Sequence, residues 1–206
     1  NALARVQTIP SFVCPSRRPV GITLEADRDN AGDKHAPGAV GDYAGNAGNG
    51  ATDYWQSTAN GVIISSFVFN LPPESRDDYE RYDSRIKFKS IIDGLSKTLL
   101  AGEKHFPLQA KNYDGSIYNG DNVNNFARVG GRIVPLALGP TDEANCSRAP
   151  GCASPCACDS FGSWHPGVCH FVFVDGHVKS IEVTIDSRVL DRLTARADGQ
   201  PIVGDY

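Results

Sequence analysis

The chain has 206 residues and a formal net charge of −4, from 20 Lys and Arg against 24 Asp and Glu. This length predicts one domain that buries roughly 70% of the surface of its unfolded chain. The weakly acidic balance argues against a nucleic-acid-binding protein, since such a protein needs a basic face to neutralise phosphates. The 21 glycines favour turns, loops and short strands over a helix bundle, and no apolar run is long enough to span a bilayer.

The first half of the chain alternates short apolar runs with polar stretches. Residues 1–24 resemble extended segments, and residues 25–61 form a Gly-, Asn- and Asp-rich loop. The β-branched and aromatic run Gly61–Asn70 is the clearest early strand. Residues 85–91 alternate polar and apolar side chains, as in a half-buried strand, and residues 98–103 form the next strand.

The C-terminal part carries the strongest local signals. Residues 171–183 contain two apolar runs around Asp175-Gly176, a pair typical of a β-hairpin turn. A helix follows, capped by Asp186 or Ser187 and running to about Ala197. We therefore predict an α+β domain in which a mostly antiparallel sheet carries long loops and a C-terminal helix.

The cysteines indicate a compartment. Four lie in a Pro-, Ala-, Ser- and Gly-rich stretch, which we interpret as an insertion at residues 140–160. The even count fits three disulfides, for which 15 pairings exist; we favour local bridges in the insertion and a Cys14–Cys169 link. The alternative is a zinc site made by thiols with His165 or His170, although the spacing matches no common zinc module. Disulfides would place the protein in an oxidising space outside the cytosol; the six cysteines are Cys14, Cys146, Cys152, Cys156, Cys158 and Cys169.

Five ordered elements resemble those of one bacterial family, whose signature is a histidine followed nine residues later by Asp-Gly. Here that signature is His165 with Asp175 and Gly176. The resemblance covers about residues 9–203 and is to the prepilin-like family with the prepilin-type processing-associated His-x9-Asp-Gly domain, formerly labelled solute-binding-like. The five elements are Phe12–Ser16, Tyr43–Asn46, Ile92–Glu103, Ser163–Val178 and Leu193–Ile202.

The resemblance implies a pilin-like globular head outside the cytoplasm, in the cell envelope or beyond it. Members of that family begin with a prepilin leader and a hydrophobic helix of about 20 residues, which residues 1–206 do not contain. We therefore expect a single domain that is a non-catalytic structural subunit. Its partners would be copies of itself or other envelope chains, and membrane contact would occur only through the N-terminal helix.

His165 and Asp175 are the most tempting pair for catalysis, with Ser163 or Ser160 as a nucleophile. We favour a structural reading instead, because Asp175 sits in the hairpin turn and His165 precedes a proline. Residues 103–105, Glu-Lys-His, are interpreted as a solvated strand end. No catalytic residue is assigned.

We assign no cofactor, and calcium is the alternative that the acidic loops offer. Asp27, Asp29 and Asp33 supply three carboxylates around Gly32, although the closing Glu of an EF-type loop is missing. A second group of hard oxygen ligands contains Asp114, Asn119, Asp121, Asn122 and Asn124.

Aromatic side chains in the polar loops suggest an alternative function. They would form a stacking platform for sugars, which would make the chain an extracellular glycan- or solute-binding module. An accessory subunit of a larger envelope complex is a further alternative. The aromatic residues are Tyr43, Tyr54, Trp55, Tyr113 and Tyr118.

Overall fold

The computed structural model describes residues 2–18, 20, 38–51, 58–64, 67–69, 79–81, 86–108, 115–118, 125–142, 160–202 and 206. In chain order its helices, 3₁₀ turns (η) and strands are α1 (Ala2–Arg5), η1 (Pro10–Phe12), β1 (Tyr43–Gly48), β2 (Phe67–Phe69), β3 (Tyr79–Arg81), η2 (Phe88–Ser90), η3 (Leu95–Lys97), β4 (Leu99–Glu103), β5 (Ala127–Val129), β6 (Val168–Phe173), β7 (Val178–Glu182) and α2 (Ser187–Thr194).

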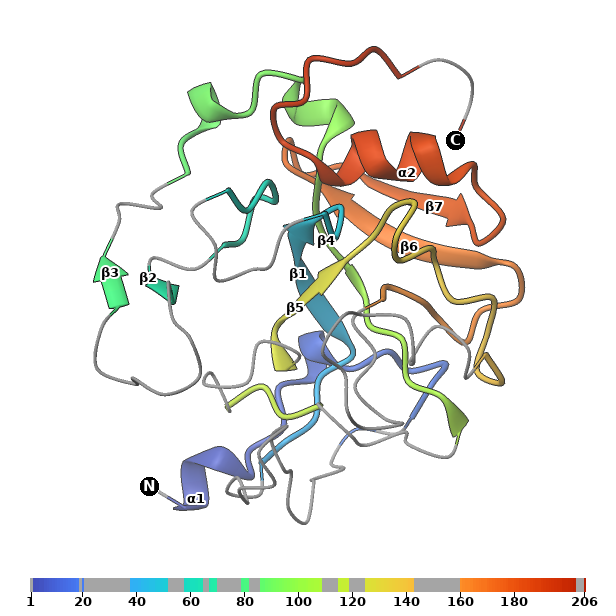
Figure 1. Ribbon diagram of the computed structural model, residues 1–206. Helices are drawn as coiled ribbons and strands as arrows, with labels where there is room; N and C mark the ends of the chain where they lie inside the picture. Colours follow the sequence, from blue (N-terminus) through green and yellow to red (C-terminus); the bar gives the residue numbers. More distant parts are fainter. Residues whose placement is uncertain are drawn as a thin grey trace.

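A five-stranded sheet in the order β5-β1-β4-β6-β7 organises the domain (Figure 1). Three of its four strand pairings are antiparallel, and only β1 and β5 run parallel. β2 and β3 form a separate antiparallel pair. The expected α+β class with a mostly antiparallel sheet is therefore confirmed.

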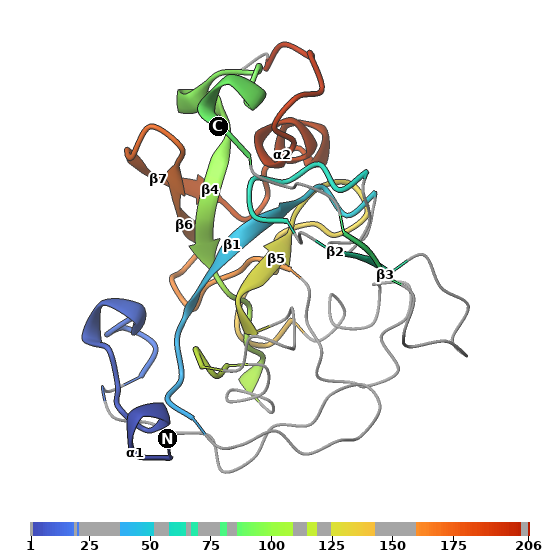
Figure 2. The same ribbon diagram turned by 90° about the vertical axis from the view of Figure 1, so that its left-hand side faces the viewer.

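The main apolar core lies between α2 and the β6–β7 side of the sheet. Leu190 and Leu193 of α2 are fully buried against Phe171 and Phe173 of β6 and Ile181 of β7. Figure 2 shows α2 end-on beside these strands. The helix begins as expected, since the Asp186 carboxylate accepts a hydrogen bond from the main chain of Arg188.

β1 is an interior strand of the sheet, between β5 and β4, although its sequence, Tyr-Ala-Gly-Asn-Ala-Gly, was expected to be part of a loop. Its small residues let neighbouring segments approach closely: a Cβ on Gly45 would lie 2.7 Å from Ile63. The buried Asn46 replaces apolar packing by donating hydrogen bonds of 2.8 Å to the carbonyls of Leu99 and Thr194. The alternation of polar and apolar residues did not predict this strand, because hydrogen bonds and close backbone contacts stabilise it in place of apolar side chains.

Other local predictions had mixed outcomes. The strand at 98–103 and the hairpin at 171–183 are confirmed by β4, β6 and β7. The predicted strand at 85–91 is wrong in its described part, where η2 leaves residues 87–89 exposed. Within Gly61–Asn70 only Phe67–Phe69 is a described strand.

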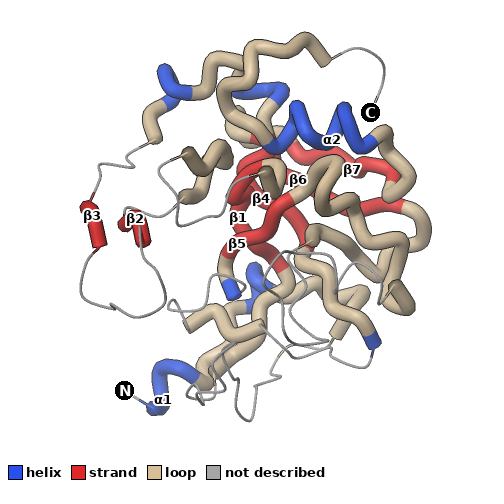
Figure 3. The backbone as a smooth tube through the Cα atoms, in the orientation of Figure 1, coloured by secondary structure: helices blue, strands red, loops and turns tan. Residues whose placement is uncertain are grey.

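The described part of residues 1–24 forms α1 and η1, not the extended segments that we expected. Figure 3 shows α1 and α2 at opposite ends of the molecule, with the sheet between them. Among the described residues, no helix has the length and apolar character needed to cross a membrane.

Candidate functional site

Three potential ligand side chains from distant parts of the chain meet at one end of β4. Cys14 follows η1, Glu103 is the last residue of β4, and His165 lies in the turn that precedes β6. The Cys14 Sγ lies 3.6 Å from the His165 Nε2, and the Glu103 Oε1 lies 3.4 Å from the same nitrogen. We call these three residues the Cys-Glu-His cluster.

Each member of the cluster is held by a hydrogen bond from or to a main-chain atom. The Glu103 Oε2 accepts from the main-chain N–H of His170 at 2.8 Å, which leaves Oε1 facing His165. The main-chain N–H of His165 donates to the Ser163 Oγ. The main-chain N–H of Cys14 donates to the Asp42 carboxylate. The arrangement is therefore built into the fold and does not depend on mobile surface side chains.

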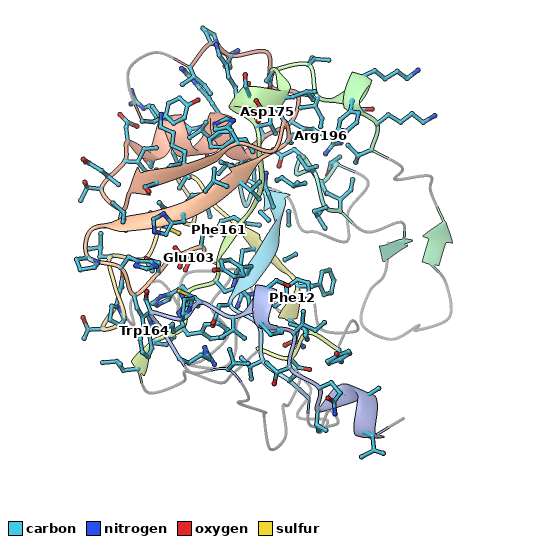
Figure 4. The ribbon with its side chains drawn as sticks, turned by 180° about the vertical axis from the view of Figure 1, so that it is seen from behind. Phe12, Glu103, Phe161, Trp164, Asp175 and Arg196 are labelled. Atoms are coloured by element: carbon cyan, nitrogen blue, oxygen red, sulfur yellow. The ribbon has the colours of Figure 1, made fainter. Side chains whose placement is uncertain are left out.

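The signature pair His165 and Asp175 does not meet. The two residues flank β6, whose six residues span about 17 Å, and Figure 4 places Asp175 at the end opposite Trp164, the neighbour of His165. Asp175 instead accepts hydrogen bonds from the main chain and the ring of His177, which lower the pKa of its carboxyl group. The Ser163 hydroxyl donates to the Val168 carbonyl. The geometry therefore offers no serine–histidine–aspartate arrangement among these residues.

A buried layer of charge lies beside the cluster. The Asp42 carboxylate, fully buried, pairs with Arg17 at 3.1 Å and with Arg18 at 3.0 Å. Both guanidinium groups also face the Phe106 ring. Sequence reasoning did not single out any of these four residues, because an isolated Asp or an Arg pair carries no local signal of burial.

The expectation that residues 103–105 are a solvated strand end is wrong, since Glu103, Lys104 and His105 are all buried. The Lys104 Nζ donates to the carbonyl of Asn125, and burial, followed by the charge of Arg128, lowers its pKa well below the ordinary value. Burial likewise lowers the pKa of His105 to about 4. β4 is the central strand of the sheet and Lys104 pairs with Phe161, so this strand end is covered although its residues are polar.

The predicted Cys14–Cys169 disulfide is wrong in this structure, where both thiols are free. Cys169 points into the core beneath α2. Its neighbour His170 points to the other face of β6 and packs against the ring of His165, which Cys14 contacts. Cys14 and Cys169 therefore lie on different faces of β6. Burial raises the pKa of the Cys169 thiol well above its usual value. The structure instead brings together Cys14 and His165, a pair included in the alternative zinc hypothesis.

Several predicted sites lie outside the described residues. These are both candidate calcium groups, the insertion cysteines at 146–158 and the aromatic residues Tyr54, Trp55 and Tyr113. Of the other two aromatic residues, Tyr118 donates its hydroxyl to the Gln7 carbonyl. Tyr43 lies opposite Glu103 in the sheet, and burial, with the nearby Cys14 and Glu103, raises its pKa to about 12.

The chemistry open to the Cys-Glu-His cluster is metal ligation more than acid–base relay. In a nucleophile–histidine–acid triad the nucleophile and the acid contact different ring nitrogens, whereas here Cys14 and Glu103 both face Nε2. Thiolate, carboxylate and imidazole are the ligands that zinc accepts.

Comparison with known proteins gives one informative match. No curated protein and no solved structure is significantly similar to this chain. A family model, SBP_bac_10, matches residues 1–188, nearly the whole length of the chain. The chain therefore belongs to the family described as "Protein of unknown function (DUF1559)".

Proposed function

We propose that this chain is a non-catalytic structural subunit, the globular head of a pseudopilin-like protein that assembles in the cell envelope or outside the cell. The placement outside the cytoplasm rests on the five elements that resemble the prepilin-type family. The structural role rests on what the side chains of those elements do in the fold.

The observation that carries the proposal is that side chains of the signature elements link distant backbone segments of the same chain. The Asp93 carboxylate accepts hydrogen bonds from the main chain of Asp198 and Gly199. Arg196 donates to the carbonyls of Ala59 and Gly61. Such contacts stabilise a rigid head, since each one closes a long loop of chain.

Further signature residues follow the same pattern. The Trp164 ring nitrogen donates to the carbonyl of Phe106, and Asn46 links two strands to the end of α2. The separation of His165 from Asp175 along β6 also favours a structural signature over a catalytic pair. These contacts within the chain support a structural role for the signature residues.

An assembling subunit needs a contact surface, and the segment around η2 supplies a candidate. Phe88 and Ile92 are 71% and 69% exposed, although they are large apolar residues. The exposed Lys87 and Lys89 flank Phe88. We call Phe88 and Ile92 the η2 patch.

Two measurements test the proposal in cells that express the complete gene product. Fractionation should recover the chain with the envelope or the medium, and chemical cross-linking there should capture it in oligomers. The Phe88→Ser/Ile92→Ser variant should reduce cross-linking several-fold. Leu138→Ser, which also removes an exposed apolar side chain (63% exposed), should leave it unchanged. Recovery of an uncross-linked chain in the cytosol would refute the proposal.

A further inference from the structure

Two separations between ligand atoms of the Cys-Glu-His cluster match those expected around one metal ion. Zinc bonds of about 2.3 Å to sulfur and about 2.0 Å to nitrogen or oxygen, at tetrahedral angles, place sulfur and nitrogen about 3.5 Å apart and nitrogen and oxygen about 3.3 Å apart. The structure has 3.6 Å between the Cys14 Sγ and the His165 Nε2, and 3.4 Å between the Glu103 Oε1 and Nε2. All three atoms lie within 4.8 Å of one another.

A purely hydrogen-bonded cluster accounts for these contacts less well. Nε2 carries at most one proton, so it can donate to either the Cys14 sulfur or the Glu103 oxygen. If Nε2 carries that proton, the Cys14 thiol cannot donate to it; if it does not, Nε2 cannot donate to Glu103. Cys14 and Glu103 are 4% and 1% exposed, so water is a poor substitute for the missing partner. A cation between the three atoms would satisfy all of them together.

We propose that Cys14, Glu103 and His165 bind one zinc-class divalent cation, with the fourth tetrahedral position left for water. Zinc suits this mixed set because it accepts sulfur, nitrogen and oxygen ligands in one tetrahedron. On binding, the Cys14 thiol releases its proton to water, and the thiolate and the Glu103 carboxylate together balance the two charges of the ion. This inference does not depend on where the protein resides or on its assembly.

The surroundings of the cluster support ligation. The main-chain N–H of His170 donates a hydrogen bond that orients the Glu103 carboxylate. Metal-binding side chains are commonly oriented in this way by a hydrogen bond from a residue that does not bind the metal. The guanidinium groups of Arg17 and Arg18 both pair with Asp42, so a carboxylate that is not a ligand offsets part of the positive charge nearby. The His165 side chain is 24% exposed, which gives an ion a path from solvent.

The consequence of metal binding is a clamp on the N-terminal segment. Cys14 belongs to the turn after η1, whereas Glu103 and His165 belong to the sheet and to the segment before β6. The existing connections between the turn and the body include the hydrogen bond from the main-chain N–H of Cys14 to Asp42 and the ion pairs of Arg17 and Arg18 with the same carboxylate. A bound ion would add metal–ligand bonds and slow local opening of residues 10–18.

The test uses Co²⁺ and Zn²⁺ alone on the full 206-residue chain, stripped of metal by a chelator under reducing conditions. Because the insertion cysteines are competing ligands, the titrations are made both in the natural sequence and in a background with four serine replacements. These replacements are Cys146→Ser, Cys152→Ser, Cys156→Ser and Cys158→Ser.

In the four-serine background we expect one Co²⁺ per chain, with thiolate-to-cobalt charge-transfer absorption and the strong visible bands of tetrahedral cobalt. Cys14→Ser should abolish the charge-transfer band, and His165→Gln should weaken Zn²⁺ binding by at least about 100-fold, since loss of an outer partner alone costs about 10–100-fold. The matched controls Cys169→Ala and His177→Gln remove a thiol and an imidazole elsewhere and should leave the spectrum unchanged.

A second measurement keeps the proposal testable if Cys14→Ser is unstable. Zn²⁺ should slow amide hydrogen exchange of residues 10–18 and protect Cys14 from alkylation in the four-serine background, with no comparable change in α2. Absence of a cobalt band there, or a band that survives Cys14→Ser in a folded protein, would overturn the proposal.

Discussion

Replacing Asp42 with asparagine is the sharpest test of how the segment that contains Cys14, Arg17 and Arg18 is held to the sheet. The Asp42 side chain is fully buried, pairs with Arg17 and Arg18, and accepts the main-chain N–H of Cys14. Asp42→Asn keeps the size of the side chain but leaves two guanidinium groups without their carboxylate. Breaking a buried ion pair by removing one partner costs about 3–5 kcal/mol.

For a chain of this length that loss lowers the melting temperature by about 6–20 °C, at about 2–4 °C for each kcal/mol. Circular dichroism during heating and urea unfolding at neutral pH measure the change. Arg132→Ala is the control, because the Arg132 side chain is 65% exposed where it pairs with Asp191, and an exposed pair contributes less than about 1 kcal/mol. If Asp42→Asn were no more destabilising than Arg132→Ala, the argument that this buried network holds the segment would fail.

Three further changes probe other parts of the fold. Asn46→Ala removes the donor to two buried carbonyl groups and should lower the free energy of unfolding, measured in urea, by about 2–4 kcal/mol. The control Asn60→Ala, at a half-buried site, should lower it by about 1 kcal/mol. Equal losses would contradict this account. Gly61→Ala would force a Cβ into the main chain of the neighbouring strand β1 and should reduce the yield of folded protein. The control Gly130→Ala, whose Cβ would make ordinary contacts of 3.4 Å, should be tolerated. Tolerance of both variants would argue against the close approach of Gly61 to β1. Hydrogen bonds from His177 lower the pKa of the Asp175 carboxyl group in the folded protein. The contribution of Asp175 to stability is therefore complete above the unfolded pKa of about 4 and is lost as the pH falls through the lower folded pKa. An NMR titration that gave an ordinary carboxyl pKa for Asp175 would refute the turn interaction.

Local sequence signals predicted the elements whose stability is local. The alternation in β6 and β7, the Asp175-Gly176 turn and the Asp186 cap each specify structure within a few residues. β1 carries no such alternation. Its place in the sheet depends on contacts with segments far along the chain, so the sequence alone could not reveal it.

The candidate site illustrates the same limit. Cys14 and His165 are 151 residues apart, so no local spacing relates them to each other. All three members of the Cys-Glu-His cluster do fall within the signature elements quoted above, which is the signal that was available. The resemblance marked the residues, but only the fold determines that Glu103 meets His165 and that Asp175 does not.

The two halves of the domain are stabilised by different physical means. Around α2, burial of Leu and Phe side chains provides the non-directional driving force of an ordinary core. Around β1 the residues are small, so little apolar area is available, and directional bonds from Asn46, Asp42 and Lys104 take its place. Because such bonds require one geometry, they specify where the segment that contains Cys14 lies more narrowly than apolar packing would. That precision is what allows three ligands from separate segments to meet at distances suited to a single ion.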